Sequence, residues 1–131
     1  MRPTVSEQLE GVSAILTGIV ADHLDDDYTR DVLLGAANIV LLLSRTWHGI
    51  PEFLRWDSAA TAAILTMVGQ TPPPPADALD IPALEKHHRH VRDCLEKSMP
   101  LIIADEAARA ATVRHFRERV ARFAFLAHKD N

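Results

Sequence analysis

Residues 28–48 read YTRDVLLGAANIVLLLSRTWH, and this stretch decides the fold class. Its apolar residues recur at steps of three and four, which is the period of one face of an α-helix. Additional leucines widen that face, so the sequence predicts a central helix over these residues. The side chains expected to face the core are Val32, Leu33, Ala36, Ile39, Val40, Leu43 and Trp47.

The segments on either side of this stretch have the same helical period. Thr4 and Glu7 have the spacing of a capping box, which predicts a helix that begins at the chain's start. Its expected apolar stripe is Val5, Leu9, Val12, Leu16, Ile19 and Val20. A third helical region is predicted over residues 51–69, with Pro51 in its opening turn. Asp57 is the candidate cap of its main part, in which case residues 51–56 form a separate short turn.

The second half of the chain is also expected to be helical, after a run of four prolines at 72–75. Such a run favours an extended conformation and predicts a crossover between helices, with a docking motif as the alternative. A fourth helix is predicted from Asp80 to Met99 and a fifth from Leu101 to His128. The expected core stripes are Leu84, His88, Val91, Leu95 and Met99 on the fourth, and Val113, Phe116, Val120, Phe123 and Ala127 on the fifth.

The fold class that follows is all-α: an antiparallel bundle of about five helices with a Pro-rich crossover and a break at Pro100. The chain has 131 residues, which is the size of one domain, so a single helical-bundle domain over residues 1–131 is predicted. This length is sufficient to bury a core without disulfides or a structural metal.

Composition argues against several classes of partner. The net charge of −4 is unlike that of a general nucleic-acid-binding domain. The longest apolar run, 39–43, is far shorter than the roughly 20 residues of a membrane helix, and no targeting segment is visible. The single cysteine, Cys94, excludes an internal disulfide and fits a reducing compartment. We therefore expect a soluble, cytoplasmic protein with no nucleic-acid or membrane partner.

Five residues are candidates for binding a small molecule. Glu106 and Arg109 extend the apolar line of the last helix backwards, so they form either an internal ion pair or the edge of a pocket. The alternative is that the helix turns after Pro100 and presents alanines 107, 108, 110 and 111 inward. His88 lies nearest the core of its helix and is the candidate proton carrier. Trp47 and Trp56 flank a turn and either form a ligand wall or seal one end of the bundle.

Metal binding and catalysis have weaker signals. His87, His90 and Cys94 have the spacing of ligands on one helix face, but His88 and His90 point in different directions. A surface location is therefore preferred for these histidines, and no metal or cofactor is expected. A metal site that uses His87 or His88 remains a third alternative. No nucleotide-binding loop, zinc-protease motif or nucleophile elbow occurs, so no catalytic residue is assigned and no enzyme class emerges.

Two segments carry a resemblance. Residues 2–12, RPTVSEQLEGV, and the segment from Trp47 to Ile64 resemble a small family of uncharacterised bacterial all-helical proteins. The resemblance covers roughly the first half of the chain and includes no catalytic motif. Such proteins are in some cases encoded near phosphotransferases that resemble aminoglycoside kinases and near enzymes that resemble acyl-CoA dehydrogenases. The resemblance thus implies an accessory role and supplies no active-site residues.

The leading hypothesis is a non-catalytic helical binding or accessory protein. It is expected to form a homodimer, the commonest assembly of such proteins, and to engage a partner enzyme through an exposed helical face. The alternative is a small-molecule-binding protein or enzyme that uses a pocket between helices, lined by the five candidate residues.

Overall fold

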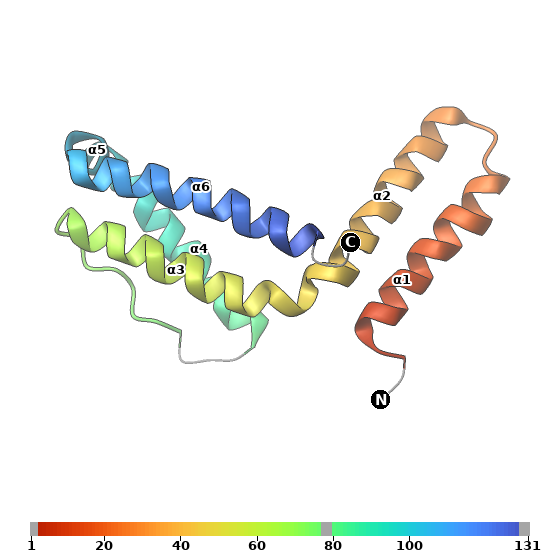
Figure 1. The fold of residues 1–131 in the computed structure, drawn as a ribbon, viewed down its shortest axis with the longest axis horizontal. Coiled ribbons are helices and arrows are strands. Elements are labelled where there is room, and N and C mark those ends of the chain that lie inside the picture. Colours follow the sequence, from red (N-terminus) through yellow and green to blue (C-terminus); the bar gives the residue numbers. More distant parts are fainter. Residues whose placement is uncertain (1–2, 77–79, 129–131) are drawn as a thin grey trace. The chain divides into compact units, whose positions relative to one another are not determined.

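The computed structural model describes residues 3–76 and 80–128, with side chains as far as Arg122 in the last helix. These residues are helical almost throughout and form no strand, which confirms the all-α class. They gather into two compact units: one holds the first two helices, and the other spans Gly49–Phe125 (Figure 1). A single domain over the whole chain stays a prediction. Within the described residues, no helix combines the length and apolar character needed to cross a membrane.

The first unit is a hairpin of α1 (Val5–Ile15) and α2 (Asp27–Thr46). The predicted capping box at its start is confirmed, because the Thr4 hydroxyl accepts from the Glu7 N–H and the Glu7 carboxylate accepts from the Thr4 N–H. α1 continues into a π-helical turn, η1 (Leu16–Val20), and a 3-10 turn, η2 (Ala21–His23). Asp26 then caps α2, and hydrogen bonds from the hydroxyl and the N–H of Thr29 lower the pKa of Asp26.

Serine hydroxyls line the contact between α1 and α2. Ser6 Oγ donates to the carbonyl of Ser44 at 2.9 Å, and Ser13 Oγ donates to the carbonyl of Ala37 at 3.0 Å. Early residues of α1 therefore meet late residues of α2, so the pair is antiparallel (Figure 1). Small side chains at this contact let the two backbones approach closely.

Part of each apolar stripe predicted for the hairpin faces outward, which corrects the prediction for those residues, whereas Leu9, Leu16, Leu33 and Val40 are half-buried. Val12, Ile19, Val32 and Ile39 were expected in the core, yet 47–69 % of each is exposed. Periodicity finds an apolar face correctly but does not say what covers it. The contact between the two helices uses a different line, at which Ser13 and Ala37 are buried.

The second unit contains α3 (Ile50–Met67), α4 (Ile81–Lys97), α5 (Met99–Ala104) and, as far as Phe125, α6 (Glu106–His128). The 3-10 turn η3 (Trp47–Gly49) leads into it. A proline lies in the first turn of α3, α4 and α5, where its missing N–H leaves no hydrogen bond unmade. The predicted break near Pro100 lies at Ser98, which ends α4 and begins α5. A second break, at Asp105, was not predicted.

The Pro-rich crossover makes α3 and α4 parallel. Leu54 and Leu84, near the starts of the two helices, line one hollow, while Ile64 and Leu95, near their ends, share the core. The chain must return along the unit between the helices, and the extended stretch after Gly69 spans that distance (Figure 1). α6 runs back antiparallel to α3. The buried core also contains Ile102 and Ala108.

The apolar stripe predicted for the last helix is wrong where the structure describes it. Val113 is 45 % exposed and Val120 is 72 % exposed, and only Phe116 packs against the core. The buried line of α6 instead runs through Ala108, Thr112 and His115. Because two of these residues are polar, a search for apolar periodicity passes over the line. Phe123 and Ala127 lie outside the described side chains.

Candidate functional site

Asp57 is a buried carboxylate in the middle of α3. It was expected to cap a helix, but α3 begins seven residues earlier, at Ile50, and the Asp57 side chain is 0 % exposed. The separate turn expected over residues 51–56 does not form, because the opening turn at Pro51 continues without a break into the helix that contains Asp57. A buried charge is costly unless it is paired, so its partners decide what it does.

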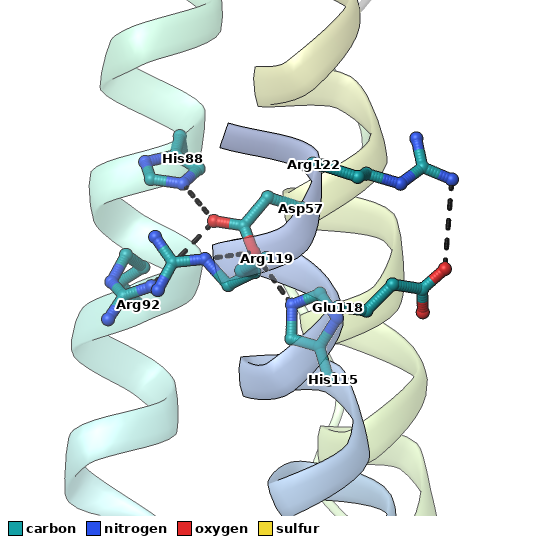
Figure 2. Close-up of polar contacts among 7 residues, drawn as sticks. All are labelled: Asp57, His88, Arg92, His115, Glu118, Arg119 and Arg122. Carbon is teal, nitrogen blue, oxygen red and sulfur yellow. Dashed lines mark hydrogen bonds and ion pairs between the residues drawn. The ribbon is translucent and has the colours of Figure 1, made fainter. Parts of the chain in front are cut away.

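Four basic side chains surround this carboxylate and form what we call the Asp57 cluster (Figure 2). From α4, His88 Nε2 lies 2.5 Å and Arg92 Nη1 lies 3.7 Å from Asp57 Oδ2. From α6, His115 Nε2 lies 2.7 Å and Arg119 Nε lies 2.9 Å from Asp57 Oδ1. One carboxylate thus connects three helices.

The two histidines hydrogen-bond to the carboxylate, whereas the two arginines act as ion-pair partners. Arg92 Nη1 and Arg119 Nε are buried but have no aligned hydrogen bond. Burial raises the pKa of Asp57, but the hydrogen bonds from His88 and His115 and the charge of Arg119 outweigh it, so the pKa lies below its usual value. Asp57 is therefore a carboxylate, not a carboxylic acid, at neutral pH.

His88 and Arg92 are members of the cluster that also reach the surface. With Leu54, Glu85 and Arg89 they line an open hollow of about 530 Å³. A carboxylate that hydrogen-bonds to one ring nitrogen fixes the orientation of the imidazole. The predicted position of His88, near the core of its helix, is confirmed by its half-buried side chain.

Trp56 belongs to the cover of the cluster. Its ring centroid lies 4.9 Å from that of His115. The guanidinium carbon of Arg122 lies over the Trp56 ring, 4.0 Å from the ring centroid. Arg122 is also 3.9 Å from Glu118 (Figure 2). Trp47, by contrast, belongs to the first unit, where its Nε1 donates to Ser6 Oγ at 2.8 Å.

Glu106 and Arg109 do not lie on the apolar line of the last helix. Both are exposed, and Ala108 between them is fully buried, so of the two alternatives the turned helix, with Ala108 facing inward, is the one observed. The helix restarts at Asp105, which turns its inner face onto Ala108 and leaves alanines 107 and 110 outside. Arg109 donates to the Ile103 carbonyl at 3.2 Å, near the end of α5. Ligand binding in the shallow depression beside the pair stays a prediction.

The histidines do not assemble a metal centre in the part of the chain that the structure describes. No group of three His, Cys, Asp or Glu side chains there is placed to hold an ion. His90 is exposed and Cys94 is half-buried. His87 lines a hollow beside α3, and burial together with the neighbouring His90 and His88 lowers its pKa.

The second candidate site is an apolar surface on the first unit, which we call the hairpin face. It consists of two stripes of exposed apolar side chains, one along α1 and η1 and one along α2. Within each stripe, residues recur at a spacing close to seven. Relative to the line of contact at Ser13 and Ala37, the 3.6-residue period turns the stripe of α1 and that of α2 to the same side of the hairpin. Ile19, which is 59 % exposed, follows in the π-helical turn η1. Its members are Val5, Val12, Ile15, Ile19, Val32, Ala36, Ile39 and Leu43.

The opposite side of the hairpin carries polar and charged residues together with Leu42, which is 36 % exposed. The same helical geometry places Glu10 of α1 and Thr17 of η1 there, with Asp31, Asn38 and Arg45 of α2. Residues 11–21 and 32–44 contain no charged side chain at all, so the hairpin face is uninterrupted by charge along most of its length.

No family model, curated protein or solved structure matches this chain. The resemblance noted in the sequence stays a prediction, as does the accessory role that it implies.

Proposed function

We propose that the protein is a helical interaction module that forms a homodimer through the hairpin face. The observation that carries the proposal is the exposure of the seven large aliphatic side chains of the hairpin face, from 41 % at Leu43 to 69 % at Ile39. Contiguous apolar surface of this kind marks an interaction site in soluble proteins.

A second copy of the chain is the partner that fits this face best. Two hairpins that pack face to face make a four-helix bundle, in which each stripe gains an apolar neighbour. The face is uncharged along most of its length and therefore compatible with its own copy. A two-fold axis uses the same patch on both copies, which is the commonest closed assembly.

Charges at the ends of the hairpin favour the antiparallel arrangement of the two copies. The turn between α1 and α2 carries Asp22, Asp25, Asp26 and Asp27, followed by Asp31, against the single base Arg30. A parallel arrangement would bring these two acidic ends together, and their repulsion would oppose assembly. An antiparallel dimer keeps them at opposite ends of the bundle.

The test compares substitutions on the two sides of α2. Wild-type protein should sediment or scatter light as twice the 14.5 kDa chain across micromolar concentrations. Ile39→Lys places a charge in the middle of the hairpin face and should yield a folded monomer, since Ile39 is already 69 % exposed in the single chain. Asn38→Lys, the matched control on the polar side, should remain dimeric.

Two results would overturn the proposal. One is a wild-type protein that stays monomeric at every concentration, and the other is an Ile39→Lys variant that dimerises as well as wild type. Far-UV circular dichroism of both variants establishes that they are folded. Engagement of a partner enzyme, expected from the sequence, stays a prediction. A binding site for such an enzyme is to be sought on the surface that the dimer leaves exposed.

A further inference from the structure

A small hollow lies in the second unit where the Pro-rich crossover passes over α3 and α4. We call it the proline pocket. Ser58, Ala59 and Ala62 of α3 form one wall, Leu84 and His87 of α4 form another, and Pro73 and Pro75 lie across it. Its volume is about 250 Å³. The two alanines leave space that larger side chains would fill, and the prolines hold the crossover extended.

Ser58 carries the anomaly of this pocket. The residue is only 4 % exposed, and its hydroxyl oxygen is buried without a hydrogen-bond partner among the described residues. Several threonine hydroxyls within helices of this protein donate to the carbonyl four residues earlier, as Thr66 does to Ala62 at 3.1 Å and Thr112 does to Ala108 at 2.8 Å. The Ser58 hydroxyl makes no such bond to Leu54. A buried polar group left unsatisfied is destabilising, so a partner for it is expected.

The remaining lining restricts the chemistry of that partner. Most of the wall is alanine, leucine and proline, which favours an apolar body. His87, the second polar group, has its pKa lowered by burial and by the neighbouring His90 and His88, so its imidazole is uncharged at neutral pH. Arg55 lies at the exposed rim. A pocket with apolar walls and few polar groups is the usual form of a small-molecule site.

We propose that the proline pocket binds a small uncharged molecule with an apolar body and one hydroxyl or carbonyl oxygen, which hydrogen-bonds to Ser58. A dry cavity of about 150 Å³ holds one benzene ring, so about 250 Å³ has room for roughly ten non-hydrogen atoms. This inference does not depend on the hairpin face, because every residue that lines the pocket belongs to the second unit.

The test uses benzyl alcohol, with toluene as the analogue that lacks the hydroxyl and benzoate as the charged analogue. Binding to the full-length protein is followed by ligand-observed NMR titration. Wild type should bind benzyl alcohol about tenfold more tightly than toluene, the ratio expected of one hydrogen bond, and should not bind benzoate. Ser58→Ala keeps the hollow and removes the hydroxyl, so it should bind the two uncharged compounds equally.

A second pair of variants tests the location. Ala62→Leu fills the hollow and should abolish binding of both uncharged compounds, whereas Ala63→Leu, exposed on the same helix and outside the lining, should bind as wild type does. Circular dichroism confirms that each variant is folded. The proposal is overturned if wild type binds none of the probes, if Ala62→Leu binds as well as wild type, or if Ser58→Ala keeps the preference for benzyl alcohol.

Discussion

Asp57 makes the stability of the second unit depend on pH. An unpaired aspartate in an unfolded chain titrates near pH 3.9, and the pKa of Asp57 in the folded protein lies lower. The folded state therefore binds a proton less readily than the unfolded state does. It follows that the contribution of this carboxylate is fully present above about pH 4 and is lost as pH falls through the folded pKa.

Replacing Asp57 with asparagine should remove both this contribution and its pH dependence. The change keeps the size of the side chain but leaves two arginines without their counter-charge, so we expect a loss of about 3 kcal/mol at pH 7. Urea unfolding measured from pH 7 to pH 2.5 should show a smaller decrease in the free energy of unfolding for the variant than for wild type. Asp93→Asn, at an exposed position of α4, is the control and should change stability by less than about 0.5 kcal/mol. A parallel decrease in all three proteins would contradict the role given to Asp57.

Single residues were predictable where the signal was local. Thr4 and Glu7 are three residues apart and satisfy each other, so their capping box followed from the sequence. The Asp57 cluster could not follow in this way, because its partners are 31 and 58 residues away for the two histidines. Which basic side chains reach the carboxylate depends on how three helices pack. A signal was nevertheless present: Pro51 marks the start of α3, so an aspartate six residues further on had to lie inside the helix.

At the scale of elements, Asp105 determines where α6 begins. Its Oδ1 accepts from the Ala108 N–H at 2.9 Å, which satisfies one of the free donors at the start of the helix. Asp105→Ala should lower the free energy of unfolding by about 1 kcal/mol. Asp105→Asn retains an oxygen acceptor and should lower the free energy of unfolding by only a few tenths of a kcal/mol. Chemical denaturation distinguishes the two, and an equal loss in both variants would show that the charge, not the hydrogen bond, is what matters.

The existence of each helix was better predicted than its direction or its buried side. Apolar period and proline positions were sufficient to place α4, and its stripe of Leu84, Val91 and Leu95 is buried as expected. The parallel pairing of α3 with α4 depends on the path of the crossover, which the period of either helix does not record. The same limit applies to the hairpin, where a regular apolar stripe indicates a face that packs against a partner but does not identify that partner.

At the scale of the whole molecule, the proposed dimer links stability to protein concentration. If the folded chain dimerises and the unfolded chain does not, a higher concentration favours the folded state by mass action. For a chain of 131 residues, a tenfold rise in concentration should then raise the melting temperature by about 2–3 °C. Calorimetry of wild type at about 5, 50 and 500 µM measures this change in melting temperature directly.

The two lysine variants separate dimerisation from other causes of that shift. Ile39→Lys should melt at a temperature independent of concentration, because its hairpin face no longer pairs, while Asn38→Lys should follow wild type. The Asp57 cluster lies in the other unit and is unchanged in both variants, so the acid sensitivity predicted for it should persist in the monomer. A melting temperature that stays constant in wild type would mean that the hairpin face is covered by something other than a second copy.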